Sequence, residues 1–263
     1  MGEMLRYITR PDHDQVFNIM SLGHIATCVV FILVFIWIFR RAGDIRRTPL
    51  FRKVQALSIF IIIGAQAIYY YWYFVLKAGG DKYPLYLCRI AGIAICVTYF
   101  IHWKPLEDFA IMACIYGGIS AVMFSSPQPF AFPHITRWAY FTMHIGMTYS
   151  ALLRVIFYHK VIGRRELINA EIINMFFVFL VLGLDLKFGW NYMFLRHVTP
   201  PDMPIIRHFH IPELLNSTTW ITTSVMLFLY AFGTAAAWLF ARWMSRKALR
   251  MEFLDAMKDA EEL

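Results

Sequence analysis

The residues that decide the fold are VFNIMSLGHIATCVVFILVFIWIF, from Val16 to Phe39, and the basic segment RRAGDIRRTPLFRK that follows from Arg40 to Lys53. The first stretch carries no acidic or basic side chain apart from one histidine. At about 1.5 Å per residue, it is long enough to cross a bilayer as a helix. It exceeds the apolar core of a signal peptide and no small-residue cleavage site follows, so we expect the protein to retain it.

The rest of the chain repeats this apolar pattern. Of the 263 residues, 59% are hydrophobic and 16% are charged, and the mean hydropathy is +0.54. A soluble domain has more charge, about 25%. The sequence therefore predicts an all-α, multi-pass integral membrane protein, located in the cell membrane if the protein is bacterial. Seven spans are expected in one bundle: Val16–Phe39, Val54–Leu76, Pro84–Ile101, Leu106–Phe124, Trp138–Tyr158, Ile168–Trp190 and Leu214–Ala241.

The net charge of +8 is distributed as an orientation signal. The basic residues gather in alternate loops and after the last span, which places the N-terminus outside and the C-terminus in the cytoplasm. No nucleic-acid-binding motif accompanies them, so we expect no nucleic-acid partner. Residues 1–241 are predicted to form the bundle, and 242–263 a cytoplasmic amphipathic helix. The basic side carries Arg40, Arg41, Arg46, Arg47, Arg52, Lys53, Lys104, Lys160, Arg164, Arg165, Arg242, Arg246, Lys247, Arg250 and Lys258.

Polar and ionisable residues converge at one depth of the predicted bundle. Such residues are costly inside a bilayer and need a structural or functional reason. The topology places His24, Cys88 and His144 about 12, 6 and 9 Å below the outer starts of their helices. Asn191 and Tyr192 lie at the outer end of the sixth span. We therefore expect a polar site in the outer-leaflet half.

Cys88 is the candidate nucleophile of this site. A thiolate is favoured near a helix N-terminus and beside a cation, and Arg89 follows Cys88 directly. His144 is the candidate general base, and the planar guanidinium of Arg89 suits a phosphate. Structural alternatives remain open: a small buried thiol, a histidine bonded to a neighbouring helix, and an ion pair between Arg89 and Asp185.

Other chemistries have little support in the sequence. The four cysteines lie in predicted helices without a C-x-x-C pair, which disfavours a disulfide framework. His197, His208 and His210 share a long outer loop, but no Cys or Glu stands at metal spacing, so no metal is expected. The chain has no P-loop, dinucleotide fingerprint, H-E-x-x-H or G-x-S-x-G motif, so we expect no cofactor.

Several short motifs resemble those of a known family. They are Pro84-Leu85-Tyr86-Leu87-Cys88, Phe132-Pro133-His134, Phe141-Thr142-Met143-His144 and Trp190-Asn191-Tyr192-Met193-Phe194-Leu195, with His24 in the first helix. They resemble, in order and spacing, the YwaF-type family of bacterial integral membrane proteins. That family is similar to the eukaryotic transmembrane protein one-sixty-four acyltransferases, which move fatty acyl groups onto lysophospholipids with a cysteine and a histidine. The chain departs from the family at Tyr86, where a histidine is common.

The resemblance implies specific roles for these residues. Cys88 is the acyl-accepting nucleophile and His144 is its partner, while His24, Asn191 and Tyr192 line the site. His134 ends a proline-rich outer loop, 125–134, which we interpret as a lid over the substrate.

The predicted function is therefore a membrane-embedded lipid acyltransferase that moves a fatty acyl group between phospholipids and lysophospholipids at the outer leaflet. Two alternatives stay open. A lipid hydrolase would use the same Cys and His but resolve the intermediate with water. A transporter or small-molecule-binding protein would line a pathway with His24, His144 and Asp185. The grouping of polar residues in one half of the membrane favours an enzyme.

Overall fold

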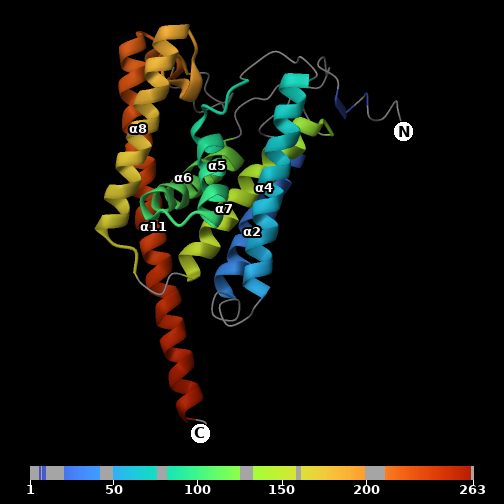
Figure 1. The fold of residues 1–263 in the computed structure, drawn as a ribbon, viewed down its shortest axis with the longest axis vertical. Helices are drawn as coiled ribbons and strands as arrows, with labels where there is room; N and C mark the ends of the chain where they lie inside the picture. Colours follow the sequence, from blue (N-terminus) through green and yellow to red (C-terminus); the bar gives the residue numbers. More distant parts are fainter. Residues whose placement is uncertain are drawn as a thin grey trace.

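The computed structural model describes residues 6, 8, 9, 21–41, 50–75, 82–124, 133–157, 161–198 and 211–261. Within these ranges the chain is all-α, as predicted, and contains no strand (Figure 1). Helices α5, α6 and α7 lie between a layer of α8 and α11 and a layer of α2 and α4. The elements are α2 (Leu22–Arg40), α4 (Leu50–Val75), α5 (Leu87–Phe100), α6 (Lys104–Met123), α7 (Ile135–Phe157), α8 (Arg164–Phe188), the 3-10 turn η1 (Tyr192–Phe194), α10 (Ile211–Leu215) and α11 (Thr219–Glu261).

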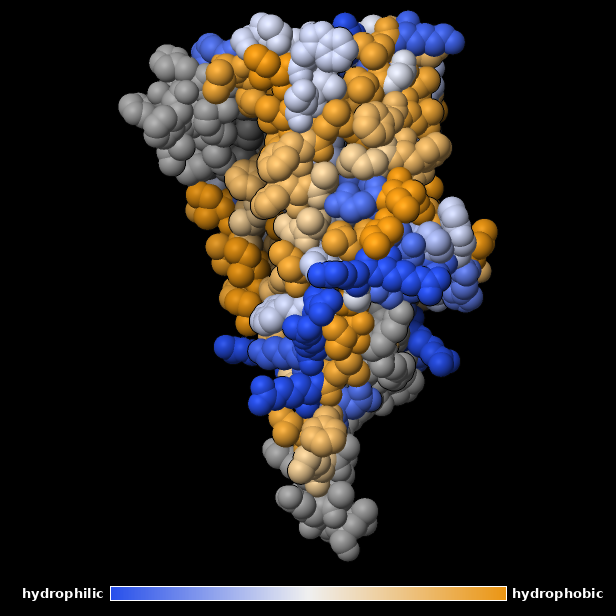
Figure 2. Space-filling view, turned by 90° about the vertical axis from the view of Figure 1, so that its left-hand side faces the viewer, coloured by the Kyte–Doolittle hydropathy of each residue, from blue (hydrophilic) through white to orange (hydrophobic). Residues whose placement is uncertain are grey.

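Five helices are long and apolar enough to cross a membrane: α2, α4, α6, α8 and α11. Their outer faces are apolar, and on α8 the side chains of Ile168, Ile172, Phe176 and Leu186 are each more than half exposed. Figure 2 shows this apolar surface between hydrophilic residues at the top and a broad hydrophilic band below. An exposed apolar surface of this extent requires lipid around it. The protein is therefore a multi-pass integral membrane protein.

Helices α5 and α7 are the two expected spans outside this group. Helix α5 has 14 residues, about 21 Å of helix, which is short for a hydrocarbon core of about 30 Å. Helix α7 has 23 residues but buries Arg137, His144 and Arg154. It packs against α4, α5, α6 and α11, and a helix enclosed by protein carries polar groups that a lipid-facing helix does not. The seven-span arrangement stays a prediction.

The last expected span has different bounds in the structure. The chain breaks at Asn216, whose side-chain amide pairs with the backbone N–H and carbonyl of Val198, both at 2.9 Å. Helix α11 begins after this break and runs for 43 residues, continuously through position 241. Its C-terminal part projects beyond the bundle in Figure 1. Residues 242–261 are thus helical and continue α11 without a break, and their assignment to a cytoplasmic segment stays a prediction.

Two adjacent glycines let α6 approach both α5 and α7. A Cβ atom at Gly117 would lie 3.8 Å from the Cα of Cys88 on α5. A Cβ atom at Gly118 would lie 2.9 Å from the carbonyl oxygen of His144 on α7 and would overlap the hydroxyl of Thr148. Small residues permit such close approach between membrane helices. The pair Gly117–Gly118 therefore sets the spacing of the three inner helices.

We expect Gly118→Ala to destabilise the protein by about 1–3 kcal/mol, because the added methyl group forces α6 and α7 apart. Gly183→Ala is the matched control, since Gly183 is exposed on α8 and nothing lies within 4 Å of its Cβ position. Thermal unfolding of the purified proteins in one detergent measures the effect. Equal melting temperatures for Gly118→Ala and the parent would contradict the close approach.

Candidate functional site

Cys88 lies in the first turn of α5. The preceding residue but one, Tyr86, is the N-cap, and its side chain makes no capping hydrogen bond. The N–H of Arg89 donates to the carbonyl of Tyr86 at 2.9 Å, so only the N–H groups before it lack a partner within the helix. Cys88 lies at the N-terminal, positive end of α5, directly before the cationic Arg89 in the chain. The half-buried thiol thus lies in a positive local field.

The guanidinium of Arg89 is buried in a group of tyrosine rings. Its central carbon lies 4.3 Å from the ring centroid of Tyr69, 5.4 Å from that of Tyr86 and 5.6 Å from that of Tyr73. Nη1 also donates to the backbone carbonyl of Tyr83 at 3.3 Å. Aromatic faces attract a desolvated cation, so these contacts hold the charge next to Cys88.

One ring nitrogen of His144 makes a hydrogen bond, and the other has no hydrogen-bond partner among the described residues. Nδ1 lies 2.7 Å from the backbone carbonyl of Tyr140. Because a carbonyl only accepts, Nδ1 carries the proton and Nε2 of the neutral ring holds a lone pair. Nε2 is buried and has no hydrogen-bond partner among the described residues, in a side chain only 1% exposed. Burying a hydrogen-bond acceptor without a partner costs free energy, so we expect a hydrogen-bond donor to bind this atom.

Cys88 on α5 and His144 on α7 both contact the same turn of α6. Cys88 contacts Gly117 from α5, and the backbone of His144 contacts Gly118 from α7. No hydrogen bond joins the described thiol to the imidazole. The structure therefore brings the two residues to one level of the bundle but does not pair them directly. Catalytic hydrogen bonds commonly tighten only when substrate is bound.

The sequence analysis missed two polar residues on one face of α4. The Nε2 atom of Gln66 lies 2.9 Å from the Cβ position of Gly92, one turn along α5 from Cys88. One turn further along α4, the ring centroid of Tyr70 lies 6.0 Å from the guanidinium carbon of Arg89, the residue after Cys88. Gln66 Oε1 and the Tyr70 hydroxyl are buried and lack hydrogen-bond partners within the described part of the chain. Their spacing of four residues in an apolar span is the signal that was available.

The motif after α8 forms a strained turn. Met193 and Phe194 have φ values of 54° and 57°, in the left-handed region that bulky residues rarely adopt. The carboxylate of Asp185 accepts the N–H of Tyr192 at 3.0 Å, and the hydroxyl of Tyr230 donates to the carbonyl of Met193 at 2.8 Å. Such strain persists only where surrounding contacts fix it, as these do.

Tyr192 and Asn191 have different surroundings in this turn. The Tyr192 hydroxyl accepts the N–H of Tyr83 at 3.1 Å, so it contacts the segment that leads into Cys88. The amide of Asn191 closes its own loop: Oδ1 accepts the N–H of His197 at 3.0 Å and Nδ2 donates to the carbonyl of that residue at 2.8 Å. Contacts of either residue with substrate stay a prediction.

His24 and His134 lie at helix ends. Nε2 of His24 is 2.8 Å from the carbonyl of Val122, at the end of α6. Nδ1 of His134 accepts the N–H of Thr136 at 3.3 Å, which caps the start of α7. These contacts give both histidines a structural role, and a role in substrate binding stays a prediction. The predicted lid residues 125–132 lie outside the described ranges.

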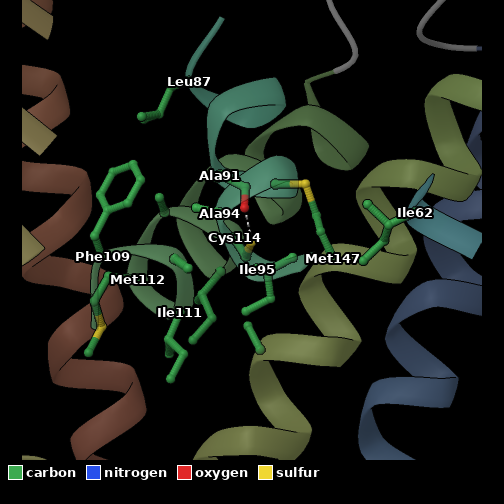
Figure 3. Close-up of a cluster of buried hydrophobic side chains, with 14 of the residues drawn as sticks. Ile62, Leu87, Ala91, Ala94, Ile95, Phe109, Ile111, Met112, Cys114 and Met147 are labelled. Atoms are coloured by element: carbon green, nitrogen blue, oxygen red, sulfur yellow. Dashed lines mark hydrogen bonds between the residues drawn. The ribbon is translucent and has the colours of Figure 1, made fainter. Parts of the chain in front are cut away.

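A second polar group lies further along α5. Arg154 donates to the Thr98 hydroxyl at 2.8 Å and to the Ile95 carbonyl at 3.0 Å, and lies 3.7 Å from Glu107. These contacts make Arg154 structural. Thr98 is ten residues after Cys88, or about 15 Å of helix. Apolar side chains fill the space between (Figure 3), among them Ile62, Ala91, Ile95, Ile111 and Met147.

Metal ligands do not cluster in the described part of the chain. It holds no group of three or more His, Cys, Asp or Glu side chains that could bind a metal ion. Of the outer-loop histidines, His208 and His210 lie outside the described ranges. The four cysteines, including Cys114 and Cys28, are unpaired.

Comparison with known proteins identifies the family. No curated protein and no solved structure matches the chain. The family model described as the TMEM164 family matches residues 17–233, which include helices α2 to α8 and the first part of α11. The match therefore covers Cys88, His144 and the strained turn after α8. With most of its length matched, the chain belongs to the TMEM164 family of membrane proteins.

Proposed function

We propose that this protein is a membrane-embedded lipid acyltransferase in which Cys88 is the nucleophile and His144 the general base. The observation that carries the proposal is the buried Nε2 atom of His144, an acceptor without a partner at the level of Cys88. Membership of the TMEM164 family supports a membrane protein with this architecture. The resemblance of residues 84–88 to YwaF-type proteins supports the choice of cysteine.

The reaction proceeds in two half-reactions. Nε2 of His144 accepts the thiol proton while the Cys88 sulfur attacks the carbonyl carbon of a phospholipid ester. The C–S bond forms, the C–O bond to glycerol breaks, and the proton passes to the departing oxygen, which releases a lysophospholipid. An acceptor lysophospholipid then gives its hydroxyl proton to His144, and its oxygen attacks the thioester and frees the thiol. Covalent catalysis of this kind divides one difficult transfer into two easier steps.

The start of α5 stabilises the charge that develops on the ester oxygen. Its first N–H groups have no side-chain cap, and donors aimed at a developing oxyanion lower the barrier in a site without water. The Arg89 guanidinium adds a full positive charge and holds the headgroup phosphate. The amide of Asn191, which we expected to line the site, is already bonded to its own loop.

The alternatives have less support. Transport requires polar groups along a path through both halves of the bundle, whereas the buried side chains between the levels of Cys88 and Arg154 are mostly apolar. Ile62, Ile95 and Met147 belong to this buried cluster (Figure 3). A lipid hydrolase would share every step up to the acyl-cysteine. Enclosure of His144 by protein disfavours entry of water and so favours transfer to a lipid hydroxyl.

We further propose that α5 and α7 complete a bundle of seven spans, with the N-terminus outside and the C-terminus in the cytoplasm. Basic residues support this orientation: Arg40 ends α2, Arg164 begins α8, and Arg242 stands in the last part of α11. The start of α5, and with it the reaction, then lies in the outer-leaflet half.

We expect the purified protein, mixed with phospholipid, to gain the mass of one fatty acyl group in intact-protein mass spectrometry. The adduct should be labile to hydroxylamine, as a thioester is. Cys88→Ser should show no such adduct, and His144→Ala should acylate more slowly by about 10²–10⁴-fold, because it lacks the proton acceptor.

Cys28→Ser is the matched control for that experiment. Cys28 lies in a neighbouring helix, with its sulfur 3.4 Å from Nε2 of His24, and should not affect acylation. An adduct that survives Cys88→Ser but disappears in Cys28→Ser would assign the nucleophile elsewhere. No adduct on any form, with no lipid turnover, would contradict the acyltransferase.

The proposed orientation predicts the behaviour of reporter fusions at the C-terminus. Fused green fluorescent protein should fluoresce in bacterial cells and fused alkaline phosphatase should be inactive, because the first folds in the cytoplasm and the second needs the periplasm. A fusion after Gly80, in the loop between α4 and α5, serves as the control and should behave in the opposite way. Active phosphatase at the C-terminus would contradict the orientation.

A further inference from the structure

Three buried polar atoms at the level of Cys88 lack hydrogen-bond partners among the described residues. They are Gln66 Oε1 and the Tyr70 hydroxyl on α4, and Nε2 of His144 on α7. The Gln66 side chain is 8% exposed. Folded proteins leave few buried polar groups unpaired, because each costs free energy. Three of them at one site indicate that a ligand supplies the missing partners.

The packing of α4 places Gln66 at the same level of the bundle as His144. Ile62 approaches both inner helices, at 3.7 Å from the Cβ position of Gly92 on α5 and 3.3 Å from that of Gly146 on α7. Gln66 lies one turn beyond Ile62, or about 6 Å, toward the end of the bundle where α5 and α7 begin. His144 lies two residues from Gly146 in the same direction. Gln66 therefore lies at the level of the proposed general base.

Tyr70 extends this polar face toward the nucleophile. It is one turn beyond Gln66 on the same face of α4, and its ring centroid lies 6.0 Å from the guanidinium carbon of Arg89, the residue after Cys88. Gly92 leaves room for the Gln66 side chain against α5, one turn from Cys88. Both side chains of α4 thus adjoin the start of α5, where the acyl group would be held.

The hydrogen-bonding character of the three atoms indicates which kind of ligand they would bind. Gln66 Oε1 and Nε2 of His144 only accept, so each needs a donor, while a hydroxyl such as that of Tyr70 donates and accepts. The ester and phosphodiester groups of a diacyl phosphatidylcholine are acceptors alone. A lysophospholipid brings one free hydroxyl, which is the donor that this site lacks.

We infer that Gln66 and Tyr70 bind the free hydroxyl of the acyl acceptor, a lysophospholipid, beside Cys88. The inference rests on the proposed acyl transfer and adds the acceptor subsite to it. Gln66 Oε1 accepts the hydrogen bond of this hydroxyl and Tyr70 donates to its oxygen. When the acyl-cysteine has formed, the hydroxyl hydrogen turns to Nε2 of His144 and the oxygen attacks the thioester, so Gln66 and Tyr70 bind and orient the acceptor.

The test measures binding, so it does not require turnover. All proteins carry Cys88→Ser, which prevents acyl-cysteine formation. Their affinities for 1-acyl-lysophosphatidylcholine and for its 2-deoxy analogue are compared by titration in detergent. The parent should prefer the hydroxyl-bearing lipid by about fivefold to tenfold, the contribution of an ordinary hydrogen bond, and more if the unpaired atoms dominate. Gln66→Met, which keeps the side-chain volume, and Tyr70→Phe should each lower this ratio toward one.

Tyr71→Phe is the matched control, because Tyr71 is 60% exposed on the same helix and faces away from α5. It should keep the ratio of the parent. Equal affinity of the parent for the two lipids would overturn the inference, as would a preference that both Gln66→Met and Tyr70→Phe retain. Absence of acyl-cysteine in the Cys88-containing enzyme would contradict the proposed function separately, since the binding ratio is measured without it.

In the Cys88-containing enzyme, a second measurement separates the acceptor subsite from the first half-reaction. Gln66→Met should form the acyl-cysteine at the rate of the parent but transfer the acyl group more slowly to a lysophospholipid, with a raised KM for the acceptor. Slowing of both half-reactions by the same factor would assign Gln66 to the structure of the site and overturn its role in acceptor binding.

Discussion

The close approach of α6 to α5 and α7 is the constraint on which the rest of the structure depends. In lipid, helices gain little from hydrophobic burial against one another, so tight packing and hydrogen bonds between helices hold them together. Gly117 and Gly118 supply the packing, and the Thr148 hydroxyl adds a hydrogen bond to the carbonyl of Cys114 at 3.4 Å. The same turn of α6 determines how far apart Cys88 and His144 lie.

Hydropathy along the sequence predicted the positions of outer and inner helices alike. The bounds of α4, α5, α6, α7 and α8 all lie within about four residues of those expected, because each is a predominantly apolar stretch bounded by polar residues. Helix α7 is enclosed, so Arg137 and Arg154 cost it little, and its sequence resembles that of a soluble helix. The break at Asn216 depends on its pairing with Val198, a contact that no local pattern encodes. The continuation of α11 past 241 follows because charge ends a membrane span but not a helix.

Depth along the helices predicted that Cys88 and His144 lie at one level of the bundle, and both contact the same turn of α6; their role in a site stays a prediction. Depth was not sufficient to find Gln66 or Tyr70. Their unpaired state depends on which helix faces α4, and that is a tertiary property. The left-handed backbone at Met193 and Phe194 could not be predicted either, because nothing in the local sequence favours positive φ angles there. Strain of this kind is maintained by contacts from α8 and α11 and orients the turn beneath the start of α5.

The hydrogen bond of Nδ1 to the Tyr140 carbonyl has a consequence for the proposed chemistry. It fixes one tautomer of His144, so a single atom, Nε2, exchanges protons in both half-reactions. A histidine free to change tautomer would present the wrong nitrogen part of the time. In the proposed reaction, burial of Nε2 would limit the access of water, so the proton would come from the thiol in one step and from a lipid hydroxyl in the other. On this proposal, a selectivity for transfer over hydrolysis would arise from the enclosure of α7 by its neighbours, which is the same feature that made its sequence atypical for a membrane span.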